Sequence, residues 1–394
     1  ADLDAKAGQA INGTTGVITA TDYTPLGDSS AIIENASATP GILRITQNTD
    51  ATWDAYFRDG IPSGPVGENC MATPGSLSLE KLGTGKAVLS VFNDYTGTTT
   101  VTDGELQVGT AGDGSWDTYT QGATTITTTS GFGQSGAAGS TGTGDTIVAG
   151  GALSGSGHIR GNTIVNAGML APGDSSGTFG PGGSTGTLYI GSNDVSSSNP
   201  VGNLTFNGGT TKMQLALATD YYPSLDDGTY YIEQGASYQS YIADIPNYFA
   251  GTAVSPNYFG EPGVFVQDTQ HDHITVGGDV LWNGGNIVVD ALDMGYFPAA
   301  GDVFNLIDWF GLGTNWGAFN VGSSNYLVGN GDDNGNLDLP DLSGIDPALR
   351  WDTSLFTSHG IIVVALSPEP SRMVLLIGGL GIVFLRRRRT NRVG

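Results

Sequence analysis

The chain has 394 residues, of which 63 are glycine and only 13% are charged, and its formal net charge is −24. An acidic surface repels the phosphates of nucleic acids, so the composition argues against a DNA- or RNA-binding protein. Glycine at this frequency disfavours long helices, and the single cysteine, Cys70, excludes an internal disulfide. The length and the 38% hydrophobic content still allow a sizeable core.

Short apolar or alternating stretches, each closed by Gly, Asn or Asp, recur along the chain. Each stretch predicts a strand followed by a turn. A repeated strand-and-turn unit without a fixed length favours a β-solenoid, in which each coil buries its inward side chains against its neighbours. An antiparallel β-sandwich is the alternative, because periodicity alone does not exclude it. The stretches are 41–50, 51–60, 75–85, 86–97, 98–104, 105–112, 146–177, 186–192, 203–218 and 273–293.

The loop that contains Asp174, Ser175 and Ser176 places hydroxyls beside a carboxylate. A nucleophilic serine also needs a base within hydrogen-bond reach, which a histidine would supply. We interpret this loop as a structural turn between coils rather than as a catalytic loop, and we expect no catalytic residue in the chain. The four histidines are His158, His271, His273 and His359.

His271 and His273 are two residues apart, so a strand would place both imidazoles on one side, as a metal pair requires. No third soft ligand lies near them in the sequence. We therefore expect a solvated strand entrance here and no metal.

The stretch 331–341 carries oxygen-bearing side chains at alternate positions, namely Asp332, Asn334, Asn336 and Asp338. This spacing suits a hard cation such as calcium, but Ser343 stands where a glutamate ligand is expected. A polar turn is the preferred interpretation, calcium binding stays open, and we expect no cofactor.

Segment 220–268 is rich in tyrosine and phenylalanine and poor in the strand-and-turn unit. Aromatic rings beside Asp and Asn can stack on sugars, or they can form a small core of the segment against the solenoid, which we prefer. Because loops on a rigid scaffold commonly carry function, we expect any binding specificity, including for extracellular polysaccharide, to lie here.

The C-terminal tail differs from the rest of the chain in charge. Residues 1–370 hold eight Lys or Arg and all 38 acids, a formal charge of −30, whereas the last 24 residues hold the other six cations. After Pro368, Glu369 and Pro370 come 13 uncharged residues, 373–385, which as a helix span about 20 Å, less than a bilayer core. The arginines that follow predict a cytoplasmic anchor, with the body across the membrane; a helix packed on the body is the alternative. They are Arg386, Arg387, Arg388 and Arg389.

The order of these elements resembles the PEP-CTERM sorting signal: Pro-Glu-Pro, a short hydrophobic stretch and a terminal arginine cluster. The resemblance implies an exported protein of a Gram-negative bacterium, held transiently in the inner membrane through 373–385. An exosortase-type membrane protease would be its partner and would cleave near Pro368, Glu369 and Pro370. The released body would reside at the cell surface or in the extracellular matrix.

Residues 77–109 resemble the autotransporter-associated β-strand repeat, and 152–190, 271–308 and the run into the tail resemble the segments that accompany it. The resemblance implies a right-handed parallel β-helix, with the repeat residues serving as scaffold. The matching positions are Leu79, Lys81, Gly83, Gly85, Tyr95, Thr96, Gly97, Gly104, Leu106 and Val108.

We therefore expect an all-β chain of four parts: a β-solenoid over 1–219, an aromatic insert over 220–268, closing coils over 269–367 and a sorting tail over 368–394 with a short hydrophobic helix. We expect a noncatalytic surface or matrix protein. The alternative is a carbohydrate-active enzyme, a polysaccharide hydrolase or lyase, on the same scaffold. A hydrolase needs paired carboxylates on one face, and a lyase acting on uronates needs cations.

Overall fold

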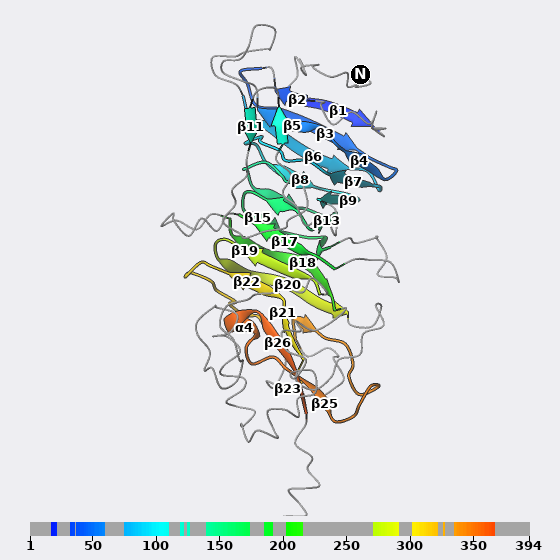
Figure 1. The fold of residues 1–394 in the computed structure, drawn as a ribbon, viewed down its shortest axis with the longest axis vertical. Coiled ribbons are helices and arrows are strands. Elements are labelled where there is room, and N and C mark those ends of the chain that lie inside the picture. Colours follow the sequence, from blue (N-terminus) through cyan, green and yellow to red (C-terminus); the bar gives the residue numbers. More distant parts are fainter. Residues whose placement is uncertain are drawn as a thin grey trace, which may run out of the picture.

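A computed structural model describes thirteen stretches of the chain, and Figure 1 shows their strands stacked one above another along the long axis of the molecule. The largest sheet has 14 strands, and its strands pair parallel to one another. This is the β-solenoid that the strand-and-turn pattern predicts, and the sandwich alternative is wrong for these strands. The described residues are 17–21, 32–35, 37–59, 75–109, 119–121, 124–126, 139–173, 185–191, 202–215, 271–290, 302–321, 326–327 and 335–366.

Each coil contributes one strand to a first ladder of parallel strands. The sequence of these strands alternates between inward and outward side chains. In Leu77–Leu82, every second side chain is buried and the others are half-exposed. The first ladder consists of β1 (Val17–Thr21), β3 (Gly41–Thr46), β6 (Leu77–Leu82), β8 (Thr99–Val101), β12 (Thr146–Val148) and β15 (Thr163–Val165).

A second ladder follows the first after a sharp corner in each coil. Two long strands, β18 (Leu204–Gln214) and β20 (Val280–Asp290), bend at Asn-Gly-Gly and run through both ladders, which joins them into one sheet. The other strands of the second ladder are β4 (Ala51–Trp53), β7 (Lys86–Leu89), β9 (Glu105–Val108), β13 (Ala152–Gly155), β16 (Met169–Pro172) and β24 (Leu337–Asp338).

A third ladder closes each coil. Between the strands at 56–59 and 158–159, the stacking continues through isolated parallel bridges at Asp94 and Ser140 rather than through full strands. Its strands are β2 (Ile32–Asn35), β5 (Tyr56–Asp59), β14 (His158–Ile159), β17 (Thr187–Ile190), β19 (His273–Val276) and β22 (Ile307–Trp309).

The stretch 269–367, where we expect closing coils, continues the parallel ladders and also contains an antiparallel sheet. Past β20, a four-stranded sheet pairs antiparallel and lies beside the single described helix, α4 (Phe356–His359). A parallel stack leaves an unpaired edge at its last coil, so a covering element is physically required there. The sheet consists of β21 (Val303–Asn305), β23 (Tyr326–Leu327), β25 (Leu349–Asp352) and β26 (Ile361–Leu366); a separate hairpin pairs β10 (Tyr119–Gln121) with β11 (Thr124–Ile126).

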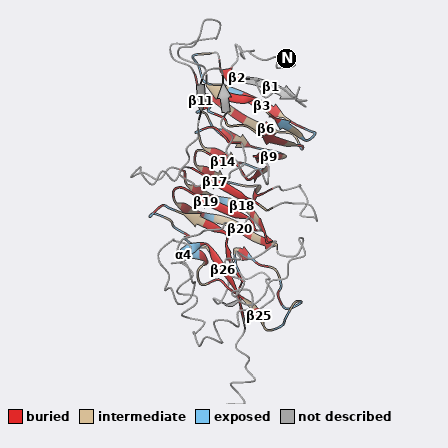
Figure 2. Cartoon of the chain, in the orientation of Figure 1, coloured by how far each residue is buried: buried red, intermediate tan, exposed pale blue. Residues whose placement is uncertain are grey.

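The core is one continuous column inside the coils, seen as the red residues along the whole stack in Figure 2. Register aligns inward residues vertically, so that Val101, Val148 and Val165 stack and are fully buried. Toward the C-terminus the column becomes aromatic: the Trp282 ring lies 4.9 Å from Phe206 and 4.6 Å from Phe319. Bulky rings therefore fill the end of the solenoid where coil stacking stops.

The predicted hydrophobic helix at 373–385 lies outside the described residues. Among the residues that are described, no helix is both long and apolar enough to cross a membrane.

Two glycines of the repeat-like stretch meet at the corner between the first two ladders. Gly104 has a φ of 61°, and a Cβ there would lie 2.1 Å from the main-chain oxygen of Gly83 in the coil next to it. Only glycine combines this left-handed backbone with so close an approach.

We expect Gly104→Ala to lower the free energy of unfolding by about 2 kcal/mol or more, because it adds backbone strain to a main-chain clash. Gly344→Ala is the control, since a Cβ at Gly344 meets nothing within 4 Å. Urea unfolding of both variants measures the difference. Equal stability of the two variants would show that the corner tolerates a side chain.

Candidate functional site

Lys81, in the repeat-like stretch, is a buried structural cation. Its Nζ donates hydrogen bonds to the main-chain oxygens of Leu82 (2.9 Å), Gly83 (2.8 Å) and Asp103 (3.2 Å). Burial lowers the pKa of Lys81 to about 8, although neighbouring carboxylates such as that of Asp103 act in the opposite direction. The ammonium thus joins main-chain oxygens of two successive coils at a corner, where Gly83 and Asp103 stand outside the strands. This geometry favours a scaffold role.

Lys81→Met keeps the length of the side chain but removes the ammonium that donates to the main-chain oxygens of Leu82, Gly83 and Asp103. We expect it to lower the free energy of unfolding by about 3 kcal/mol. Lys86→Met, at the half-exposed lysine five residues on, should cost less than about 1 kcal/mol. Denaturant titrations of both variants decide the matter, and a Lys81 variant as stable as the Lys86 variant would rule out the proposed corner role.

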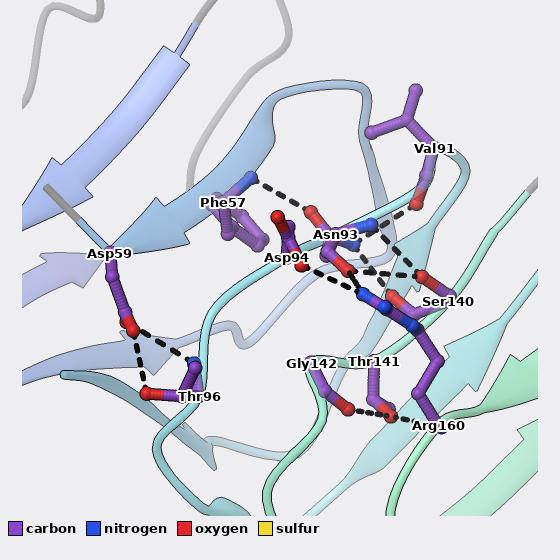
Figure 3. Close-up of polar contacts among 10 residues, drawn as sticks. All are labelled: Phe57, Asp59, Val91, Asn93, Asp94, Thr96, Ser140, Thr141, Gly142 and Arg160. Atoms are coloured by element: carbon purple, nitrogen blue, oxygen red, sulfur yellow. Dashed lines mark hydrogen bonds and ion pairs between the residues drawn. The ribbon is translucent and has the colours of Figure 1, made fainter. Parts of the chain in front are cut away.

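Asn93 organises the third ladder where it has no full strand (Figure 3). Its side-chain oxygen accepts from the Phe57 N–H at 2.8 Å, and its Nδ2 donates to the oxygens of Val91 (3.0 Å) and Ser140 (2.6 Å). The main-chain N–H of Asn93 donates to Ser140 Oγ at 2.9 Å, and its main-chain oxygen accepts from the Arg160 guanidinium at 2.8 Å. A buried amide therefore replaces the main-chain bonds that a continuous ladder would supply.

Charged residues alternate in sign along the outer side of the third ladder. Glu34 pairs with Arg58 at 2.7 Å, Arg58 neighbours Asp94 across a parallel bridge, and Asp94 pairs with Arg160 at 3.1 Å. The Arg160 guanidinium also lies over the Phe92 ring, 4.5 Å from its centre. These cations neutralise neighbouring carboxylates, so their charge is already compensated within the fold.

Asp59 ties the same side of the solenoid to the repeat-like stretch. One of its oxygens accepts from the N–H groups of Leu77 (2.6 Å) and Thr96 (3.2 Å), and the other accepts from Thr96 Oγ1 at 2.6 Å (Figure 3). The neighbouring Tyr95 is fully buried, and burial raises its pKa to about 12 while its hydroxyl bonds Thr99 Oγ1 at 2.6 Å. The Tyr-Thr-Gly element thus serves as a corner.

The expectation of a solvated strand entrance at His271 and His273 is wrong, because both side chains are buried. Their rings lie 6.5 Å apart, His271 Nε2 contacts the Asn305 oxygen at 3.1 Å, and His273 Nε2 lies 3.3 Å from Asp308 Oδ2. Packing of β21 and β22 against this strand removes the water that the sequence pattern suggested. No group of three or more His, Cys, Asp or Glu side chains suited to a metal occurs among the described residues.

Asp272, between these histidines, fastens the point where the chain leaves the coils. Its two oxygens accept from the main-chain N–H groups of Gly186 (3.0 Å) and Gln214 (2.8 Å). Burial raises the pKa of Asp272 well above 3.8, against the effect of these two bonds. A bridge between Leu215 and His271 completes a neck, which we define as 214–215 with 271–272.

His158 is buried on the third ladder, with Nε2 against the Gly191 oxygen. Burial lowers the pKa of His158 to about 4, below 6.5 for an exposed imidazole. The unfolded chain therefore takes up a proton as the pH falls from about 6.5 to 4, whereas the folded chain does not. The stability that His158 contributes is present above pH 6.5 and is lost across this window.

We expect the free energy of unfolding of the native protein to fall relative to that of His158→Gln by about 3 kcal/mol between pH 7.5 and pH 4. Taking the difference cancels other titrating groups such as Asp272. Denaturant unfolding at four or five pH values measures it. His359→Gln in α4 is the comparison and should show a smaller change with pH, because His359 is more exposed although burial also lowers its pKa. A difference independent of pH would contradict the buried neutral state of His158.

Several predicted residues lie outside the described part of the chain. They are Cys70, the loop residues Asp174, Ser175 and Ser176, the segment 220–268, Asp332 and Asn334, and the tail residues Pro368, Glu369, Pro370, Arg386, Arg387, Arg388 and Arg389. Of the suggested calcium ligands, Asn336 and Asp338 are described, and Asp338 lies in β24, paired with Val288 of β20. The Asn336 amide donates to the Gly285 oxygen at 2.9 Å and accepts from the Asn320 N–H at 3.0 Å. Its side chain therefore serves as a link between coils.

Sequence reasoning missed Asn93, Asp59 and Asp272. Asn93 and Asp59 stand next to predicted turns, which is the available signal, but their partners in other coils lie 18 to 67 residues away. The sequence pattern at 271–273 points to the two histidines and not to Asp272 between them. The available signal is the strand periodicity, which places the Asp272 side chain on the face opposite to His271 and His273.

Comparison with known proteins gives one result that bears on these residues. Residues 79–108 match the model of the passenger-associated-transport-repeat family, and this stretch contains Lys81, Tyr95 and Gly104. No curated protein and no solved structure matches the chain. The matched repeat, together with the parallel coils, favours a surface-exposed β-repeat protein of the exported kind found in Gram-negative bacteria.

Proposed function

We propose that this protein is a noncatalytic component of the cell surface or extracellular matrix, where it presents an acidic β-solenoid. The observation that carries the proposal is the parallel stack of coils whose 79–108 stretch matches a transport-associated repeat. A stack of this kind is a rigid, extended support on which binding segments can be placed without altering the core.

The proposed route to the surface runs through the C-terminal tail. The cations at Arg386 to Arg389 would hold 373–385 in the inner membrane while the body, with its charge of −30, lies outside. An exosortase-type membrane protease would then cut near Pro368, Glu369 and Pro370 and release the body.

The contacts of the titratable residues support a noncatalytic role. Arg58 and Arg160 are engaged in ion pairs, as is Arg44 with Glu80 at 2.7 Å, and Lys81 binds main-chain oxygens. A lyase acting on an anionic polysaccharide would need such cations for its substrate, so the enzyme alternative is the weaker one. His158 and His271 contact main-chain oxygens and have lowered pKa values, which suits structural positions.

We further propose extracellular polysaccharide as a partner, with 220–268 as one contact. Its aromatic residues suit sugar rings, and the segment begins and ends at the neck formed by 214–215 and 271–272. Asp272 holds the neck, so the described residues that flank the segment are fixed on the coils.

Intact-mass analysis of the protein from its native host tests the sorting proposal. We expect the surface form to end near Pro368, Glu369 and Pro370, and the full-length form to occur only in the inner membrane. Arg386→Ala combined with Arg387→Ala should raise the share of unprocessed chain, while Lys86→Ala should not. A surface form that still contains Arg386 to Arg389 would overturn the proposed processing.

A further inference from the structure

The outer side of the first ladder carries an uncharged strip in a strongly acidic protein. Five outward residues follow one another in register through β8, β12, β15, β18 and β20, and all five are half-exposed. On the N-terminal side of Thr100, the neighbouring outward position is Glu80, which pairs with Arg44. The uncharged run begins after this ion pair. The strip consists of Thr100, Ile147, Ile164, Thr205 and Leu281.

An exposed ladder of asparagine side chains borders this strip on the side of the second ladder. Asn207 Nδ2 donates to Asn166 Oδ1 at 2.8 Å, and Asn283 Nδ2 donates to Asn207 Oδ1 at 2.9 Å. Each amide offers two donor hydrogens and two acceptor lone pairs, and Asn207 uses one of each along the ladder. The remaining donors and acceptors recur once per coil, about 4.8 Å apart.

The opposite border is built to hold the coils in register. Asn162 Oδ1 accepts from the Asn203 N–H at 2.9 Å, and Asn203 Oδ1 accepts from the Asp279 N–H at 2.8 Å. Asn162 also donates to Asp145 at 2.8 Å. Side chains therefore lock successive coils together, and the spacing of the strip is fixed before any ligand arrives.

The shape of the strip selects the kind of partner. It is one side chain wide and about 20 Å long, since five coils contribute one outward residue each. A stable protein–protein interface buries about 800 Å² on each partner, which so narrow a strip does not offer. The main-chain groups of its strands are already paired in the ladder, so a peptide strand cannot be added there either.

We propose that this strip, with the Asn166–Asn207–Asn283 ladder beside it, binds a single chain of an uncharged linear polysaccharide lying along the solenoid axis. Sugar C–H faces pack on Ile147, Ile164 and the other strip side chains. Sugar hydroxyls, which both donate and accept, meet amides that do the same. The absence of charge on the strip, within an acidic protein, disfavours anionic polymers.

This inference rests on the proposed function in one respect, namely that a polysaccharide lies outside the cell. It adds the contact surface and the class of polymer, and it places a binding surface on the coils themselves, separate from 220–268.

Native gels containing hydroxyethyl cellulose, dextran or alginate test the proposal with the full chain in mild detergent. We expect hydroxyethyl cellulose or dextran to retard the native protein and alginate not to do so. Ile164→Lys places a charge in the strip and should weaken binding about tenfold or more, and Asn207→Ala should weaken it about threefold.

Asn286→Lys is the matched control, because it adds the same charge at an exposed outward position of the second ladder and should bind like the native protein. Thermal unfolding confirms that the variants are folded. No retardation by either neutral polymer, equal retardation by alginate, or equal binding of Ile164→Lys and native protein would each overturn the proposal. None of these results affects the mass of the surface form, so the two proposals fail separately.

Discussion

The structure depends on main-chain hydrogen bonding between successive coils. A three-residue strand such as Thr146–Val148 cannot be stable alone, and it exists because Thr99–Val101 and Thr163–Val165 pair with it on both sides. The corners are where this pairing fails, and each needs another donor or acceptor. Side chains meet that need at three places: Lys81 at a corner, Asn93 in the gap of the third ladder and Asp272 at the neck.

The same requirement accounts for the use of charge. A body with 38 acids and eight cations would repel itself if its few positive groups faced solvent. Instead Arg58 and Arg160 alternate with carboxylates along the third ladder, and Lys81 is buried beneath a corner. The first ladder differs: beyond its Arg44–Glu80 ion pair, its outward side chains are uncharged. The three sides of one coil therefore offer chemically different surfaces to the surroundings.

The sequence was sufficient to predict the coils, because alternation in stretches such as 77–82 and the Gly-rich turns follow from local geometry. It was insufficient for the antiparallel sheet at the C-terminal end, whose strands need partners far apart in the chain. The site residues divide in the same way. Lys81 was identified as scaffold from its repeat-like surroundings, whereas the burial of His271 depends on Asn305 and Phe304, which no local pattern connects to it.

The neck between Leu215 and His271 has an evolutionary consequence. The bridge between Leu215 and His271, together with the bonds of Asp272, holds the two residues that flank the intervening segment next to each other. The entropic cost of lengthening a closed loop grows only slowly with its length. Lineages can thus enlarge, shorten or exchange what is carried at this point while every coil keeps its register. The contacts that the protein makes can therefore diversify while the fold of the solenoid stays unchanged.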